Sequence, residues 1–208
     1  AGRCGTSLMM QTLNLLGIPL MGSHSGSEGH SLWQNYQNRN NIILRDLPTN
    51  KNPKGYYELP LEKLSELTKG RIPRNHMGQA LKFTAPEVVN VPVDAIEAII
   101  FCKRKYIAKA GESMYLLAQQ DYEYAEEHHL NDCFANMYCF LTAKDWQTHM
   151  EMFNRDIDRW IRVSNIKSKT IYFEDMLSNP KQIITYLGDF FNLDNPNISE
   201  ALKNVEQS

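Results

Sequence analysis

A short turn near the amino terminus, residues 2–7, combines residue types that bind anions. It reads Gly-Arg-Cys-Gly-Thr-Ser and opens an apolar run with helical spacing. Gly5 permits a positive φ and close approach of an anion to the backbone. The N–H groups that follow would point outward, where the helix dipole favours negative charge. Arg3 adds a guanidinium, and Thr6 and Ser7 add hydroxyls. The turn predicts a phosphate or sulfate site; a helix start capped by Thr6 or Ser7 stays open as the alternative.

The same turn differs from the nucleotide-binding motif of P-loop kinases and NTPases. That motif, GxxxxGK[ST], places a Lys directly after its second Gly, and here that position holds Thr6. Without this Lys, a magnesium-nucleotide mechanism loses its main phosphate contact. The difference argues against a kinase or NTPase, which is kept as a competing hypothesis.

Hydrophobic spacing predicts the elements that must position this turn. Helices are expected at residues 6–17, 60–69, 106–124, 145–163 and 180–191, and short strands at residues 79–84, 96–102 and 169–173. The polar segment 22–57 is expected to be mobile or to face a substrate. Strands that alternate with helices predict an α/β fold of three layers, with a mainly parallel central sheet flanked by helices. We expect a single domain over residues 1–208, with a first strand upstream of residue 1.

Composition excludes several classes of protein. Hydrophobic residues make up 42% of the chain and charged residues 22%, which excludes a disordered chain. The net charge of −2 argues against a dedicated nucleic-acid binder. The four cysteines have no zinc-site spacing and are expected to be core thiols. No apolar stretch reaches the roughly 18 residues of a membrane span, and no signal peptide is visible, so a cytoplasmic location is expected.

Five motifs, in order along nearly the whole chain, resemble the PAPS-dependent sulfotransferases, in particular their small bacterial-type branch. The turn Gly2 to Leu8 is similar to the family's P-R-S-G-T-S-L loop. Asn52 to Glu58 is like N-P-x-G-[YF]-x-E, and Lys82 to Pro86 loosely matches the K-D-P strand end. The strand before Lys103, with Ser113 after it, is similar to the 3′-phosphate site, and 172–180 is like Y-E-D-L-L-x-x-P. The resemblance implies a P-loop-like fold.

The resemblance implies a donor, 3′-phosphoadenosine-5′-phosphosulfate, that releases 3′,5′-adenosine bisphosphate without a metal. The acceptor would be a hydroxyl or amine of a small molecule or glycan. The turn, Arg3 with Cys4, Gly5, Thr6 and Ser7, would hold the leaving 5′-phosphate. The 3′-phosphate would lie at Lys103, Arg104, Lys105 and Ser113; the alternative for this basic cluster is a solvated helix start.

The acceptor proton requires a general base. Glu58 is the first candidate, since the family places a carboxylate at this point; alternatively it complements the dipole of the helix starting at Pro60. His30 and His24 are weaker candidates from the polar segment. Lys82 could contact the bridging oxygen or the acceptor, or face solvent. Glu174 and Asp175 are expected to be structural, as N-caps or as partners of a basic loop.

The chain also departs from the family pattern. Cys4 stands where Ser is usual, and no Asp-Pro follows the basic cluster. The cation that contacts the 3′-phosphate therefore stays open among Lys103, Arg104 and Lys105. The irregular cluster also keeps open a protein of this fold that binds a nucleotide without turnover.

Overall fold

The computed structural model describes residues 4–21, 66–67, 69–70, 77–83, 87–127 and 140–206. Within these ranges the helices and strands occur in the following order: α1 (Thr6–Leu15), the 3-10 turns η2 (Glu87–Asn90) and η3 (Val93–Ala95), β1 (Ala98–Lys103), α4 (Ile107–Glu127), α6 (Ala143–Ser164), β2 (Lys167–Tyr172), α7 (Phe173–Ser178), α8 (Pro180–Phe190) and α9 (Ile198–Glu206).

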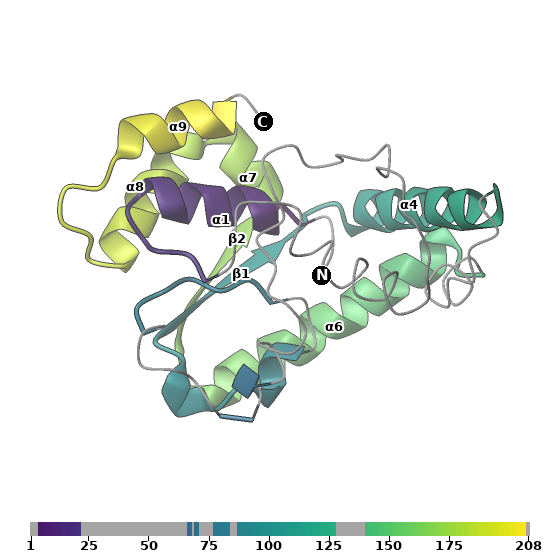
Figure 1. The fold of residues 1–208 in the computed structure, drawn as a ribbon, viewed down its shortest axis with the longest axis horizontal. Coiled ribbons are helices and arrows are strands. Elements are labelled where there is room, and N and C mark those ends of the chain that lie inside the picture. The colour runs from purple at the N-terminus through teal and green to yellow at the C-terminus, as the bar shows by residue number, and fades with distance from the viewer. Residues whose placement is uncertain are drawn as a thin grey trace.

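The two described strands lie side by side and run parallel (Figure 1). The register pairs Ala98 with Lys167 and continues to Lys103 with Tyr172. Parallel strands need a long crossover, which α4 and α6 supply here. Both carboxyl ends therefore lie at the same edge, where α4 follows β1 and α7 follows β2. The described chain is thus mixed helix and strand with a small parallel sheet.

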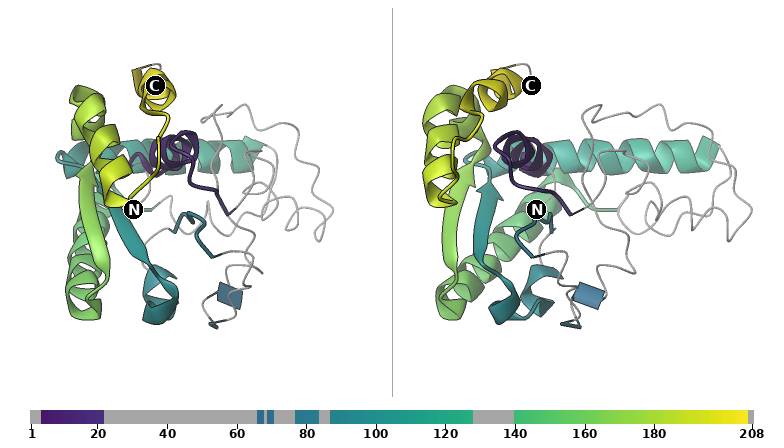
Figure 2. Two further views of the ribbon diagram at one scale, coloured as in Figure 1. Left: turned by 90° about the vertical axis from the view of Figure 1, so that its left-hand side faces the viewer. Right: turned by 60° about the vertical axis from the view of Figure 1, so that its left-hand side comes forward.

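The helices form two groups around this sheet (Figures 1 and 2). In one group α1 packs against α9, and α8 packs against α7 and α9. In the other, α4 packs along α6: α4 extends away from the carboxyl end of β1, and α6 runs back to the start of β2 (Figure 2). Gly111 makes this approach possible, because a Cβ there would lie 3.0 Å from the backbone nitrogen of Gln147.

One hydrophobic core joins the first group of helices to the sheet. It includes Leu8 and Leu13 of α1, Ile171 of β2, and Ile184 and Leu187 of α8, the last two with no exposed surface. Burying side chains of this size contributes about 1.5–3 kcal/mol each. The core therefore fixes α1 against β2 and α8, and with it the turn that precedes α1.

Local signals account for several helix ends. The hydroxyl of Thr142 accepts a hydrogen bond from the Asp145 N–H, and the Asp145 carboxylate accepts one from the Thr142 N–H, so α6 begins with a capping box. It ends at Asn165, which has a φ of 55°. Pro180 opens α8, as the sequence predicts, because Pro has no N–H to lose at a first helical position.

The strand expected at residues 79–84 is wrong. Among the described residues 77–83, only Ala80 makes a bridge, to Leu20. The Ala80 N–H donates to Pro19 O, and the Met21 N–H donates to Ala80 O, each at 2.8 Å. Pro19 has no N–H with which to extend this ladder. Of the helix expected at residues 60–69, only residues 66, 67 and 69 are described, and 66–67 are helical; the segment 22–57 lies outside the described residues.

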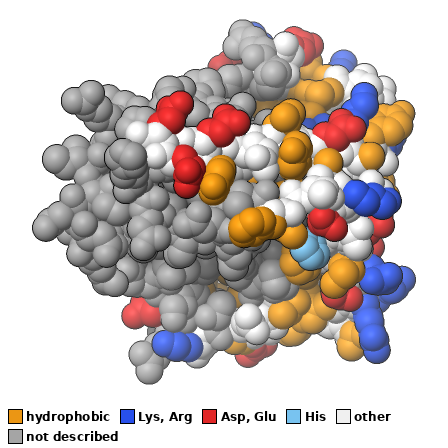
Figure 3. Space-filling view, turned by 90° about the vertical axis from the view of Figure 1, so that its right-hand side faces the viewer, with side chains coloured by type: hydrophobic (Ala, Val, Ile, Leu, Met, Phe, Trp, Pro, Cys, Tyr) orange, Lys and Arg blue, Asp and Glu red, His pale blue; other side chains and the backbone are white. Residues whose placement is uncertain are grey.

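The remaining elements agree with the expected ones to within a few residues. The strand expected to end at residue 173 ends at Tyr172, and Phe173 starts α7. The helices α7 and α9 were not expected from the sequence. On α6, Met150 and Ile157 are buried, while Trp146, His149 and Phe153 are half-buried. Figure 3 shows hydrophobic side chains (orange) gathered on one face of the described part of the molecule.

Candidate active site

The turn before α1 is held in a left-handed conformation by a glycine. Gly5 is the N-cap of α1, with a φ of 76° and a ψ of 16°, and its carbonyl accepts the Met9 N–H at 2.9 Å. Because Gly has no side chain, Gly5 provides no side-chain acceptor for the N–H groups of the first turn. The alternative of Thr6 or Ser7 as N-cap is therefore wrong: both lie in the first turn of the helix, half-buried.

A second reason requires glycine at position 5. A Cβ there would overlap Cδ2 of Phe173 and would lie 3.0 Å from its Cε2. Phe173 is the first residue of α7, directly after β2. The ring therefore packs against the backbone of the turn, and the carboxyl end of β2 lies next to the start of α1.

Lys82 lies at the same turn. Its Nζ donates to Ser7 Oγ at 3.5 Å, and the side chain is half-buried. Ser7 and Lys82 belong to separate sequence motifs, and the fold brings them together. A lysine ammonium at the start of a helix adds positive charge beside outward-pointing N–H groups.

The basic cluster at residues 103–105 is matched by three carboxylates. Lys103 Nζ lies 2.5 Å from Asp158 Oδ2, and Arg104 Nη1 lies 3.6 Å from Glu174 Oε1. Lys105 Nζ pairs with Asp175 Oδ1. The cluster therefore joins the end of β1 to α6 and α7. An anionic ligand here would compete with these carboxylates for the cations.

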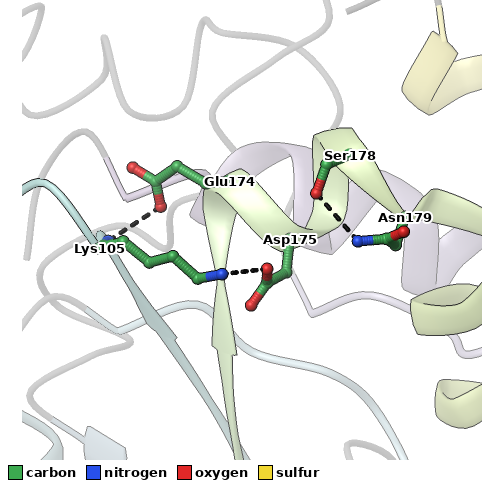
Figure 4. A network of polar contacts seen from close by, with 5 residues as sticks. All are labelled: Lys105, Glu174, Asp175, Ser178 and Asn179. Atoms are coloured by element: carbon green, nitrogen blue, oxygen red, sulfur yellow. Dashed lines mark hydrogen bonds and ion pairs between the residues drawn. The ribbon is translucent and has the colours of Figure 1, made fainter.

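Glu174 also holds the backbone in front of α4 (Figure 4). Its Oε2 accepts the Lys105 N–H at 2.9 Å. Burial by itself would raise the pKa of Glu174, but hydrogen bonds from the N–H groups of Lys105, Glu174 itself and Tyr106, together with the charge of Arg104, bring the pKa below its ordinary value. The expectation that Glu174 and Asp175 are structural partners of a basic loop agrees with these contacts.

Of the three cations, Arg104 has contacts that lead to the turn. Its Cζ lies 4.0 Å from the centroid of the Phe173 ring, and that ring packs on Gly5. Burial raises the pKa of the Cys4 thiol, and the charge of Arg104 acts in the opposite direction. Lys103 instead pairs with α6, and Lys105 pairs with Asp175 at the exposed surface.

Cys4 faces the core. It is 2% exposed and shares the hydrophobic core with Cys102, whose pKa is raised to about 12 by burial and by the nearby Cys4. The expectation of core thiols is met at both positions, and Cys133 and Cys139 lie outside the described residues. With its thiol in the core, Cys4 could offer an anion its backbone N–H alone.

Ser113 lies in the second turn of α4 and is half-buried. Arg3, Glu58, His30 and His24 lie outside the described residues. Phe173 and Asp158 were not among the site residues expected from the sequence. Phe173 stands directly before the Glu174-Asp175 pair, which is a usable signal, whereas nothing in the sequence around Asp158 points to Lys103.

A surface hollow of about 810 Å³ lies elsewhere, among α7, α8 and α9, and is lined by residues such as Lys181, Tyr186 and Asp189. No residue of the turn at 4–7 or of the cluster at 103–105 lines it, so it is separate from the candidate site. Among the described residues, no group of three His, Cys, Asp or Glu side chains could hold a metal ion. Nor is any helix in those ranges long and apolar enough to cross a membrane.

Comparison with protein-family models, with characterised proteins and with solved structures finds no match to this chain. The functional conclusion therefore depends on the residues of the site itself.

Proposed function

We propose that this protein is a sulfotransferase that moves a sulfuryl group from 3′-phosphoadenosine-5′-phosphosulfate to a hydroxyl or amine of a small molecule or glycan. The observation that carries the proposal is the turn at residues 4–7. A left-handed Gly5 opens α1, Lys82 lies 3.5 Å from Ser7, and Arg104 is linked to the turn through Phe173. These groups suit an anion at the start of the helix.

The reaction breaks the bond between sulfur and the bridging oxygen of the donor and forms a bond from sulfur to the acceptor oxygen or nitrogen. The bonding electrons remain on the 5′-phosphate of the leaving bisphosphate, and the acceptor proton passes to a base. By analogy with phosphoryl transfer, positioning and charge stabilisation supply most of the catalysis. Lys82, the N–H groups of the turn and Arg3 would stabilise the charge on the leaving phosphate, and Glu58 would take the proton.

The proposal includes a wider fold. The parallel strands β1 and β2 would belong to a larger P-loop-like sheet flanked on both faces by helices. In such sheets, ligands bind at the carboxyl ends of the strands. The turn and the basic cluster both lie at this edge. A cytoplasmic location belongs to the same proposal.

One observation favours a second candidate. Lys103, Arg104 and Lys105 all have carboxylate partners, so this cluster has little net positive charge for a 3′-phosphate. A protein of the same fold that binds a nucleotide at the turn, without turnover, would also fit these contacts.

Ligand-dependent stability separates the candidates. We expect 3′,5′-adenosine bisphosphate at 100 times its Kd to raise the free energy of unfolding by about 2.7 kcal/mol. Magnesium-ATP should have a smaller effect. Transfer from labelled donor across an acceptor panel, in the presence of chelator, would establish the sulfotransferase. Stabilisation without transfer would favour the second candidate. Stabilisation by magnesium-ATP alone, or activity that needs magnesium, would support a kinase instead.

Arg3→Ala provides the site-directed test of the turn. It should lower transfer by roughly 10²–10³-fold, the usual effect of removing one group that stabilises transition-state charge. Lys203→Ala is the matched control, because Lys203 is an exposed cation on α9 whose ion-pair partner is Glu200. An Arg3→Ala variant with more than half of the wild-type turnover would contradict the assignment of the turn.

A further inference from the structure

The surface hollow among α7, α8 and α9 has a volume of about 810 Å³. This volume is within the range of about 300–1,000 Å³ that is usual for small-molecule sites. On α8, Gln182, Tyr186 and Asp189 are spaced by four and three residues, so they lie on one face of the helix. Leu202 and Glu206, four residues apart on α9, also line the hollow. The packing of α8 against α9 therefore brings these two helix faces together around it.

Exposed polar side chains line the hollow without a partner in the described part of the chain. They are Gln182, Thr185, Asp189 and Glu206, and none of them makes a hydrogen bond or ion pair with another described residue. Exposed groups of this kind exchange hydrogen bonds with water for hydrogen bonds with a ligand at little net cost. Together they offer an amide, a hydroxyl and two carboxylates, so the hollow presents both donors and acceptors.

Tyr186 adds an aromatic ring to the hollow. The ring is half-buried, and its centroid lies 5.9 Å from the centroid of the Phe190 ring and 4.5 Å from Lys169 Nζ. These contacts hold the ring in place. Leu202, also half-buried, supplies an aliphatic surface to the same hollow. The site therefore combines apolar surface with hydrogen-bonding groups, as small-molecule sites generally do.

The charges around the hollow favour a neutral ligand. Lys181 is a cation, whereas Asp189 and Glu206 are anions. An anionic ligand would meet two carboxylates, and a cationic ligand would meet an ammonium. A ligand with several hydroxyls avoids both penalties, because each hydroxyl donates and accepts hydrogen bonds. If it also has an apolar C–H face, that face can pack on the Tyr186 ring. A saccharide has both properties.

We propose that the hollow among α7, α8 and α9 binds a neutral oligosaccharide, with its hydroxyls on Gln182, Asp189 and Glu206 and the face of one sugar ring on Tyr186. This binding is separate from the transfer reaction proposed above, because no residue of the turn at 4–7 or of the cluster at 103–105 lines the hollow. It therefore requires neither the nucleotide nor turnover.

The experiment titrates the isotope-labelled full chain with neutral trisaccharides of glucose, galactose and mannose and follows the backbone amide resonances by NMR. We expect one of the three to shift resonances of residues 178–189 and 202–206 with a Kd of about 1 mM, because hydrogen bonds exchanged with water contribute little net free energy. Shifts centred on other residues would overturn the proposal. So would the absence of shifts with all three trisaccharides.

Asp189→Asn tests the contacts of the site. The amide keeps the size of the side chain and removes the charge, so the Kd of the bound trisaccharide should rise roughly 10-fold, the usual effect of losing a hydrogen bond to a charged group. Asp194→Asn is the matched control, because Asp194 is an exposed carboxylate between α8 and α9 that does not line the hollow. Its Kd should equal that of the wild type. Equal Kd values for both variants would remove Asp189 from the site.

Two further titrations test the class of ligand. Inorganic phosphate serves as the anionic probe, and a linear alkyl diamine serves as the cationic probe. Neither should shift the resonances of residues 178–189 and 202–206 as much as the bound trisaccharide does at the same concentration. A larger shift with phosphate would overturn the proposal in favour of an anion site, and a larger shift with the diamine would overturn it in favour of a cation at Asp189 and Glu206.

Discussion

Lys82 and Ser7 are 75 positions apart in the chain, yet the Lys82 ammonium donates to the Ser7 hydroxyl at 3.5 Å. Ser7 lies in the first turn of α1, and Lys82 follows the single bridge between Ala80 and Leu20. That bridge brings the segment of Lys82 alongside the chain that leaves α1. A long contact of this kind can open when an anion arrives, because the ammonium can turn toward the stronger acceptor.

Lys82→Gln should therefore lower the rate of sulfuryl transfer by roughly 10²-fold, since it removes one cation from the leaving phosphate. Lys82→Arg, which keeps the charge, should retain more activity. Steady-state kinetics with a saturating donor provide the measurement. Lys181→Gln on α8, at an exposed position away from the turn, is the control and should leave kcat unchanged. Equal rates for Lys82→Gln and the wild type would remove Lys82 from the site.

Gly5→Ala should destabilise the fold more than a glycine replacement at the same backbone angle elsewhere. Gly78 is the matched control, since its φ of 75° is close to the 76° of Gly5, and no atom lies within 4 Å of the Cβ position. The backbone cost of roughly 1–2 kcal/mol is common to both variants. Gly5→Ala must also displace the Phe173 ring. Thermal unfolding should show a larger Tm loss for Gly5→Ala, and equal losses would contradict the contact.

The three cations of the basic cluster should differ in function. Arg104→Gln should weaken binding of 3′,5′-adenosine bisphosphate by roughly 10- to 100-fold, the range for a lost hydrogen bond to a charged group. Lys103→Gln should act mainly on stability, because it leaves the partly buried Asp158 carboxylate without its 2.5 Å partner. Calorimetric titration and thermal unfolding of both variants test this division. If Lys103→Gln weakened bisphosphate binding and Arg104→Gln lowered only stability, the 3′-phosphate would be assigned to Lys103 instead.

Glu58→Gln tests the general base. The amide keeps the size of the side chain and cannot accept the proton, so kcat should fall by roughly 10²–10⁴-fold while the Kd of the bisphosphate changes little. If Glu58 only complements a helix dipole, the variant should lose no more than about 1 kcal/mol of stability and keep its kcat. A normal kcat would direct the search to His30, His24 and Lys82.

The pH dependence of stability tests Glu174. Its pKa in the folded chain lies below the ordinary value of 4.5, so its ionised form stabilises the fold above that pH, and this contribution disappears as the pH falls through the folded pKa. The Tm of Glu174→Gln should lie below that of the wild type by a constant amount near neutral pH. This difference in Tm should become smaller below about pH 4.5. Glu200→Gln, at an exposed pair with Lys203, should change Tm little throughout. A pH-independent difference would contradict the assignment.

Local patterns in the sequence were sufficient to predict most of the described helices and strands and the turn before α1. The apolar spacing after Gly5 predicted α1, the run before Lys103 predicted β1, and Pro180 marked the start of α8. These signals are local, because burial of one helix face or strand face repeats with the period of the element. The same local reading failed at residues 79–84, where strand formation depended on a partner segment that contains Pro19.

By itself the sequence determined that a glycine turn opens α1 and that three consecutive cations lie at the end of β1. Only the tertiary structure decided what these residues contact. Asp158 pairs with Lys103, Glu174 pairs with Arg104, and the Phe173 ring fills the space beside Gly5. Such contacts join residues more than 50 positions apart, and they depend on how α6 and α7 pack at the carboxyl edge of the sheet. Hydrophobic periodicity sets which face of an element is buried, but the partner of a charge is set by where that packing places the opposite charge.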